Sequence, residues 1–379
     1  MSFIASSKKD LLSTEKRIFG YDVIRFIAIF YVFWGHGAIL IPNELKEIYS
    51  WGTFLPLEGV SIFFVLSGFL IGNILLRTIQ KTNFNLKELS NFWFRRWYRT
   101  LPNYYVVLFI LLLTGAKSEN FDLRFLIFTQ SFSGDHPDFF NPTWSLAVEE
   151  WFYTLFPLIL FLSLLGIRKL KTSLFLSISI FILVPLALRF FNHFNPDFLE
   201  ISSTPRKITI FRFDSMMFGI LAAYIYSKHK EFWIEKAKFF TIAGIASLVV
   251  IIFVKKYSNL YQTEIFENVF VYYFESIPIF FFLPFFSSLK SIKFKKLEKF
   301  IVVMSKLSYS IYLVHGSLVL WFILRNLESN NTFIEIRFEF QRVILFILYI
   351  VLSIIFSLFL YVFLEKPIMN YRDKITKHY

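Results

Sequence analysis

Long apolar runs alternate with short polar and basic segments along the whole chain. Because about 20 apolar residues are needed to span a hydrocarbon core about 30 Å thick, we predict about ten transmembrane helices. The predicted spans are Ile24–Ile41, Phe54–Leu76, Pro102–Thr114, Trp144–Leu165, Leu174–Phe191, Ile208–Tyr226, Phe239–Val254, Val269–Phe286, Leu307–Leu324 and Arg342–Phe363. The expected fold class is all-α, a polytopic transmembrane helix bundle.

The segments between the runs differ in charge from one side to the other. Most of the 40 lysine and arginine residues fall in the tails and in alternate loops. By the positive-inside rule, this bias places both termini in the cytoplasm and makes residues 1–20 a cytoplasmic tail. The net charge of +13 therefore reflects topology, and we expect the lipid bilayer as partner and no nucleic acid.

Composition agrees with the pattern. The chain has 53 phenylalanines, 21% aromatic residues and a mean hydropathy of +0.57, all beyond the range of soluble domains. It has no cysteine, which excludes disulfides, a thiolate nucleophile and a thiolate-ligated metal, and we expect no metal site. The N-terminus lacks the features of a signal peptide. Residues 1–379 are expected to form a single membrane domain.

Ionisable residues inside the predicted spans are costly and by default suggest function. Arg25 and His36 lie eleven residues apart, about three helical turns and roughly 16 Å of rise, so they share a similar face. Arg25 is expected near the cytoplasmic surface and His36 in the outer half of the membrane. Two structural interpretations stay open: Arg25 as a snorkelling anchor, and His36 as a hydrogen-bonded packing residue.

A second group begins the predicted span at residue 144. Ser145, Glu149 and Tyr153 follow an i, i+4 spacing and line one helical face. Glu149 is expected at the depth of His36, where a carboxylate would orient an imidazole acting as a general base; Glu150 is the second choice. Alternatively, the two glutamates only charge the first turns of the helix, where its dipole favours anions.

A third group lies on the inner side. Arg95, Arg96 and Arg99 fall within little more than one helical turn, with Trp97 and Tyr98 interleaved. Arginine suits bidentate phosphate binding, and aromatic rings can stack on an adenine. The alternative is a patch that contacts anionic lipid headgroups.

Two further segments carry polar residues into spans. Glu58 lies near the outer surface, and Gly68 and Gly72 follow at a spacing typical of close helix packing. Arg212 and Asp214 enter the sixth predicted span, where pairing with each other or with neighbours is the favoured structural interpretation.

Together these groups place cations at the inner face and a histidine with carboxylates toward the outer face. The pattern suits an anionic donor bound from the cytoplasm whose reactive end is handed across. A transporter or flippase using Arg25, His36 and Glu149 as a relay is the rival, although no pair of glycine- or proline-broken spans indicates inverted repeats. A membrane scaffold would leave the arginine group and the buried histidine unexplained.

The same residues resemble those of acyltransferase family 3, the integral membrane acyltransferases that include O-acetyltransferases of lipopolysaccharide O-antigen, exopolysaccharide and peptidoglycan. The resemblance covers the whole chain in order. The matching elements are Arg25 and His36 in an arginine-x10-histidine motif, FFVLSGF at Phe63–Phe69, RRxxRxxP at Arg95–Pro102, WSLxxEExFYxxxP at Trp144–Pro157, SKLSYSIYLVH at Ser305–His315, and EKP at Glu365–Pro367.

The resemblance implies transfer of an acyl group, usually acetyl, from cytoplasmic acyl-coenzyme A to a carbohydrate hydroxyl, in the bacterial inner (cytoplasmic) membrane. Members often carry a fused extracytoplasmic SGNH-type domain. Because this chain ends at Tyr379, soon after the last predicted span, we expect no such domain. A self-contained enzyme or one with a separate extracytoplasmic partner protein is expected instead.

Roles follow as hypotheses. His36, oriented by Glu149 or Glu150, acts as general base or accepts the acyl group transiently. The coenzyme A phosphates bind Arg95, Arg96 and Arg99, with Arg25 at the inner mouth. The expected substrate contacts are Trp144, Ser145, Glu58 and Tyr153.

Overall fold

The computed structural model describes residues 11, 17–50, 52, 57–82, 84–115, 117–196, 199, 205–257, 263–329 and 338–376. Within these residues the chain is helical and contains no strand, which confirms the predicted fold class. The first half holds α2 (Phe19–Gly37), α3 (Lys46–Ser50), α4 (Gly59–Lys81), α5 (Leu86–Leu113), α6 (Thr143–Ile167) and α7 (Leu170–Phe194). The second half holds α8 (Asp214–Lys228), α9 (Lys230–Glu235), α10 (Ala237–Tyr257), α11 (Val271–Ser288), α12 (Lys295–Val314), α13 (Arg325–Ser329), α14 (Phe338–Leu360) and α15 (Lys366–Thr376).

Three segments adopt the wider π-helical form: η9 (Phe266–Phe270), η10 (His315–Leu324) and η11 (Tyr361–Glu365). Short 3-10 turns fill the connections, at Ala38–Leu40, Asn43–Leu45, Ser118–Asn120, Leu123–Ile127, Pro205–Lys207 and Thr209–Phe211.

Eight helical stretches of the described chain are long and apolar enough to cross a membrane. They are Phe19–Leu40, Gly59–Lys81, Thr143–Ile167, Leu170–Phe194, Ala237–Lys255, Phe266–Ser288, Lys295–Leu327 and Phe340–Thr376. The other two predicted spans fall on α5 and α8. Helix α5 carries the arginine group in its first half, and α8 has only 15 residues. The start of the second predicted span, residues 54–56, and most of the predicted tail lie outside the described residues.

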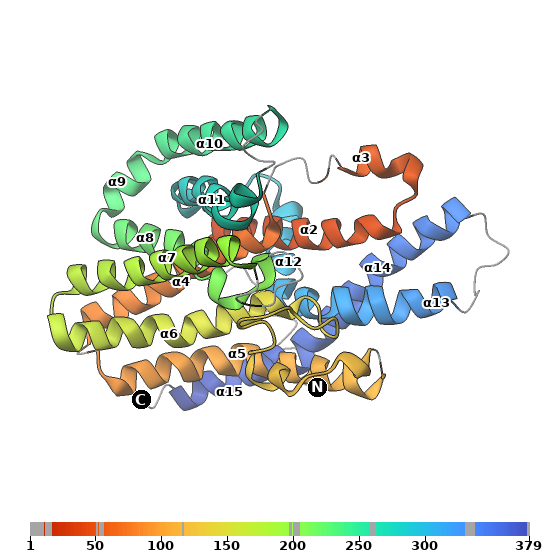
Figure 1. The fold of residues 1–379 in the computed structure, drawn as a ribbon, viewed down its shortest axis with the longest axis horizontal. Helices are drawn as coiled ribbons and strands as arrows, with labels where there is room; N and C mark the ends of the chain where they lie inside the picture. Colours follow the sequence, from red (N-terminus) through yellow and green to blue (C-terminus); the bar gives the residue numbers. More distant parts are fainter. Residues whose placement is uncertain are drawn as a thin grey trace.

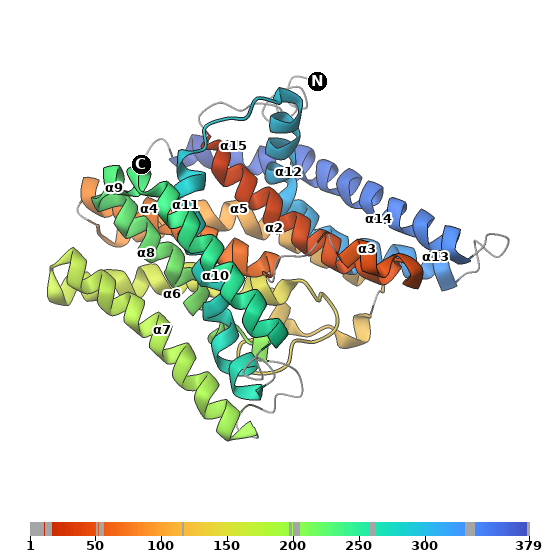
Figure 2. The same cartoon turned by 90° about the horizontal axis from the view of Figure 1, so that it is seen from above.

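The helices place the charged groups at opposite ends of the bundle. The α4–α5 and α6–α7 connections lie at one end of the long axis, and α3 and α13 lie at the other (Figures 1 and 2). We call the first the inner end, after the predicted orientation, and the second the outer end. Arg96 and Arg99 lie in the half of α5 that starts at the inner end, whereas His36 lies in the last turn of α2 toward the outer end.

Helices α4 and α8 pack at very close range because glycines face the opposite backbone. A Cβ atom at Gly68 would lie 2.0 Å from the carbonyl oxygen of Met216, and one at Gly219 would lie 2.0 Å from that of Val65. Only glycine tolerates this approach. The predicted packing role of Gly68 is therefore confirmed.

Buried charges between α7, α8 and α11 are structural. Asp214 pairs with Arg189, whose Nη2 lies 2.5 Å from its Oδ2, and both side chains are almost fully buried. Arg212 donates to Ser61 (3.3 Å) and lies 4.1 Å from the ring centroid of Tyr272. Arg212 and Asp214 thus pair with other residues and not with each other, which is the second of the two predicted arrangements.

Candidate active site

A cavity of about 330 Å³ runs along one face of α4. Its lining on this helix extends from Val60, near the outer end, through Ser67 to Arg77, near the inner end. Seventeen residues of α-helix rise about 25 Å, so the cavity follows most of the thickness of a hydrocarbon core about 30 Å deep. Helices α2, α5, α6, α8 and α12 supply the remaining walls.

Cations dominate the inner part of this cavity. Arg25, Arg77, Arg96 and Arg99 line it, and among its lining residues the only carboxylate is that of Glu149. Arg25 lies 3.9 Å from Asp22. The surplus of guanidinium groups in a confined space favours an anionic ligand, and phosphate oxygens match their geometry.

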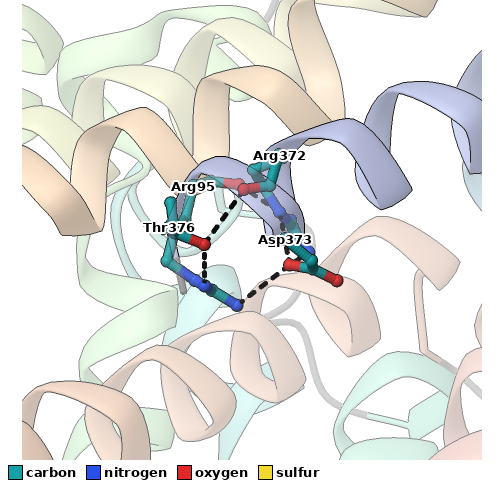
Figure 3. Close-up of polar contacts among 4 residues, drawn as sticks. All are labelled: Arg95, Arg372, Asp373 and Thr376. Carbon is teal, nitrogen blue, oxygen red and sulfur yellow. Dashed lines mark hydrogen bonds and ion pairs between the residues drawn. The ribbon is translucent and has the colours of Figure 1, made fainter. Parts of the chain in front are cut away.

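Arg95 does not join this group, contrary to the arrangement expected from the sequence. Its Nη1 donates to the hydroxyl of Thr376 (2.7 Å), and its Nη2 lies 3.3 Å from a carboxylate oxygen of Asp373, both on α15 (Figure 3). Arg95 and Arg99 lie only about 40° apart around the helix, so what distinguishes Arg95 is its position one turn nearer the start of α5, where its side chain bonds to α15. Arg372 of α15 also donates to the carbonyl oxygen of Arg95 (3.0 Å).

Glu149 reaches into the cavity but does not contact His36. Ser67 donates to one of its carboxylate oxygens (3.0 Å), and the Tyr153 hydroxyl donates to the other (2.9 Å). The Arg96 guanidinium lies 3.9 Å from the centroid of the Tyr153 ring. The expected Glu149–His36 hydrogen bond is therefore wrong: the face shared by Glu149 and Tyr153 turns toward α4 and α5, whereas His36 lies on α2.

The partner of His36 is a second histidine. His315 Nε2 lies 3.3 Å from His36 Nδ1, and the two ring centroids are 5.0 Å apart. His315 is fully buried at the start of η10, whereas the His36 side chain is exposed at the outer end of α2. His315 thus takes the position beside His36 that was predicted for a carboxylate.

The hydrogen bonds of this pair fix where its protons lie when both rings are neutral. His315 Nδ1 lies 3.0 Å and 2.9 Å from the carbonyl oxygens of Ile311 and Tyr312, and carbonyl oxygens only accept, so Nδ1 carries the proton. His36 Nδ1 lies 2.8 Å from the Val32 carbonyl oxygen and is protonated for the same reason. His315 Nε2 then accepts from His36 Nδ1, and His36 Nε2 keeps a free lone pair. A lone pair on a fixed, exposed imidazole is what a general base requires.

A hydroxyl pair stands between the cavity and the histidines. Ser145 and Tyr312 line the outer end of the cavity, and their hydroxyl oxygens are 2.5 Å apart. The Tyr312 hydroxyl also donates to the carbonyl oxygen of Pro142 (2.9 Å), and its ring lies 5.8 Å from that of His315. His36 itself does not line the cavity. The Tyr312 ring therefore lies between the outer end of the cavity and the histidine pair.

Comparison with known proteins agrees with this arrangement. The family model described as the acyltransferase domain of acyltransferase 3 matches residues 18–362, nearly the whole chain. The chain belongs to acyltransferase family 3. The family predicted from the sequence motifs is thus confirmed, and the matched region contains the cavity and the histidine pair.

Curated relatives of this acyltransferase match over shorter stretches. "Putative O-acetyltransferase SACOL0978" of Staphylococcus aureus is 34% identical over 171 residues, which cover 40% of this chain and 26% of that protein. "Peptidoglycan O-acetyltransferase OatA" of Listeria monocytogenes is 29% identical over 186 residues, which cover 44% and 28%. The chain thus matches about a quarter of the length of these relatives. No solved structure matches it.

The remaining predicted site residues of this acyltransferase lie near the cavity without lining it. The Tyr153 hydroxyl donates a hydrogen bond to the Glu149 carboxylate. Glu150 is buried on the neighbouring face of α6, and the His36 ring bonds to Val32 and His315, so Glu150 does not orient His36 either. Glu58 pairs with Arg206 at 3.0 Å, and the Arg206 guanidinium lies 5.5 Å from the centroid of the buried Trp144 ring.

Two site residues of this acyltransferase were missed in the sequence. His315 is an ionisable residue in the middle of a predicted span, the same signal that singled out His36. It also ends the SKLSYSIYLVH element. Arg77 was counted only as a basic loop residue, although it follows Ser67 at ten residues, close to three helical turns, on the same face of α4.

Proposed function

We propose that this protein is a membrane O-acetyltransferase that moves an acetyl group from acetyl-coenzyme A at the inner end of the cavity to a carbohydrate hydroxyl at the outer end. The observation that carries the proposal is the cavity, which begins among four arginines and ends at a hydroxyl pair beside two histidines. Its family and the O-acetyltransferase names of its relatives support the reaction class.

The donor fits the charge and the shape of the cavity. Coenzyme A carries phosphates on a nucleotide head and a long, thin pantetheine arm that ends in the thioester. We assign the phosphates to Arg96, Arg99 and Arg77, with Arg25 deeper in the inner part. The arm then follows α4 toward Ser145 and Tyr312, and the largely apolar walls exclude water that would hydrolyse the thioester.

The histidine pair supplies the base. His36 Nε2 takes the proton from the acceptor hydroxyl while the hydroxyl oxygen attacks the thioester carbonyl carbon. The carbon–sulfur bond breaks, and the departing coenzyme A thiolate receives the proton from the His36 imidazolium. His315 Nε2 accepts a hydrogen bond from His36 Nδ1–H and thereby keeps His36 Nε2 directed at the acceptor hydroxyl. Ser145 and Tyr312 are placed to donate to the developing oxyanion once their mutual contact opens.

An acyl-histidine route adds a covalent intermediate. His36 Nε2 would attack the thioester carbonyl carbon, and the carbon–sulfur bond would break to release the thiolate. The acceptor oxygen would then attack the acetyl carbon, the carbon–nitrogen bond to His36 would break, and the thiolate would take the hydroxyl proton. Rapid-quench capture of labelled protein in the absence of acceptor separates the two routes, because only this route labels the chain.

The direct test uses purified protein in nanodiscs with labelled acetyl-coenzyme A and glycan, without any gradient. Ester formation is expected, and His36→Ala should lower the rate by about 10²–10⁴-fold, the usual contribution of a general base. His193→Ala is the matched control, because His193 lies near the same end of the bundle on α7 and contacts only Phe194 among the recorded ring pairs. An undiminished rate for His36→Ala overturns the base assignment. Glycan movement that requires a gradient, with no ester formed, would instead identify a transporter.

We further propose that the protein acts in the bacterial inner membrane on surface polysaccharide, lipopolysaccharide or peptidoglycan glycan. The peptidoglycan activity named for the Listeria relative supports that acceptor class. The test is mass spectrometry of the surface glycan from a deletion strain, in which one O-acetyl group should be lost and then regained on complementation. A separate extracytoplasmic partner, if one takes part, would co-purify with the tagged chain.

A further inference from the structure

A second cavity, of about 480 Å³, opens at the outer end of the bundle. It lies between the end of α5, the segment before α6, and the outer part of η10 with α13. Its volume falls in the range of small-molecule sites, roughly 300–1,000 Å³. It is separate from the donor cavity, with which it shares no lining residue.

The walls of this outer cavity combine a flat aromatic surface with donors and acceptors. Trp321 lies in the wall, and the Lys117 ammonium (5.2 Å from the ring centroid) and the Arg325 guanidinium (5.6 Å) lie over its ring. Lys117 forms an ion pair with Asp138, and Asn141 supplies an amide. A sugar ring has an apolar C–H face and a rim of hydroxyl groups that both donate and accept. An indole beside a carboxylate, an amide and an ammonium group matches both parts.

The outer cavity lies close to the outer end of the donor cavity. Ser317 lines it and follows His315 by two residues in η10, so the two side chains point to nearly opposite sides of that helix. Asn141, which also lines it, accepts from Lys207 (3.0 Å). Pro142, the next residue, accepts from Tyr312 at the end of the donor cavity. Residues 141–142 and the start of η10, where Gly316 lies against Pro142, therefore stand between the two cavities.

We propose that the outer cavity is the acceptor subsite, which binds a carbohydrate with one ring against Trp321 and its hydroxyls on Asp138 and Asn141. This proposal rests on the proposed acetyl transfer and adds the place where the acceptor binds. A phospholipid headgroup fits less well, because the Asp138 carboxylate repels a phosphate and neutralises Lys117.

Binding and turnover test the subsite separately. Saturation-transfer NMR on the protein in nanodiscs would use chitotetraose, maltotetraose and sn-glycerol 1-phosphate as probes. Binding of at least one of the two sugars is expected, with Kd and acceptor KM raised about tenfold or more in Trp321→Ala, the loss of one stacked ring. Trp321→Phe should restore part of the affinity. Asp138→Asn, at an exposed position, should weaken sugar binding without affecting the fold.

Leu123→Ala is the matched control, since Leu123 is exposed on the same α5–α6 connection but lies outside the cavity. No binding of either sugar to the unaltered protein, binding of glycerol phosphate alone, or sugar binding unchanged in both Trp321→Ala and Asp138→Asn would overturn the subsite. Coenzyme A binding, measured on the same samples, should stay within twofold in every variant. A protein that binds sugar at Trp321 but transfers no acetyl group would overturn the proposed function and leave the subsite in place.

Discussion

Replacing neighbouring arginines of α5 provides a sharp test of the donor site, because the structure separates residues that the sequence groups together. Arg99 lines the cavity, whereas Arg95 binds Asp373 and Thr376 of α15. We predict that Arg99→Ala weakens coenzyme A binding strongly and that Arg95→Ala leaves it unchanged. The two variants remove the same charge from the same helix, one turn apart.

The expected magnitudes follow from the two environments. A hydrogen bond to a charged group contributes about 1.5–3 kcal/mol, so losing the Arg99–phosphate contact should raise the Kd by about 10- to 150-fold. The side chains of Arg95 and Asp373 are 49% and 47% exposed, and an exposed ion pair contributes at most about 1 kcal/mol to folding. Arg95→Ala should therefore cost only a small shift in the melting temperature.

Isothermal titration calorimetry with coenzyme A on the protein in nanodiscs gives both constants, and thermal unfolding checks that each variant is intact. Arg99→Lys keeps the charge but loses the planar fork, so its Kd should fall between those of the unaltered protein and Arg99→Ala. Equal weakening by Arg95→Ala and Arg99→Ala would refute the assignment of the cavity as the donor site. Unchanged coenzyme A binding in both variants would refute this assignment as well.

Four further changes test other parts of the structure. His315→Phe removes one of the two acceptors for His36 Nδ1–H and leaves the Val32 carbonyl oxygen, so steady-state kinetics should give a kcat about 10–100-fold lower with an unchanged donor KM. Gly68→Val forces a side chain onto the α8 backbone and should lower stability by about 1–3 kcal/mol in thermal unfolding, whereas Gly166→Val, in open space, should not. Asp214→Asn leaves a buried guanidinium without its counterion and should cost about 3–5 kcal/mol in the same assay. Burial lowers the pKa of His136 in the α5–α6 connection from 6.5 to about 4. The free energy of unfolding should therefore be at its full value above pH 6.5 and fall by up to about 3 kcal/mol toward pH 4. His136→Phe should remove this pH dependence.

The sequence predicted the position of residues along the membrane normal better than their position across it. Apolar runs set helix length, so Arg99 at the inner end and His36 at the outer end follow directly from counting residues. The order of helices around the bundle leaves no such periodic signal. Glu149 and His36 were therefore paired by depth alone, although the Glu149 side chain turns toward Ser67 and Tyr153.

Side-chain direction on one helix was the second limit. Three arginines within little more than a turn look like one cluster, but Arg95, the one nearest the start of α5, bonds to α15 instead. The partner on α15 lies 278 residues away in the chain, and local sequence does not predict contacts at that separation. His315 was missed for a similar reason: 279 residues separate it from His36, and only the fold brings them together.

The hydroxyl contact between Ser145 and Tyr312 has a consequence for the cell's energy supply. A passage about 25 Å long that filled with water and opened at both ends would let protons leak across and discharge the electrochemical gradient. Tyr312, whose hydroxyl contacts Ser145 and donates to the Pro142 carbonyl oxygen, closes the passage at its outer end. Under the proposed function, acetyl groups would leave the cytoplasm one at a time through a membrane that stays sealed to ions, with Tyr312 swinging aside only while the pantetheine arm fills the space behind it.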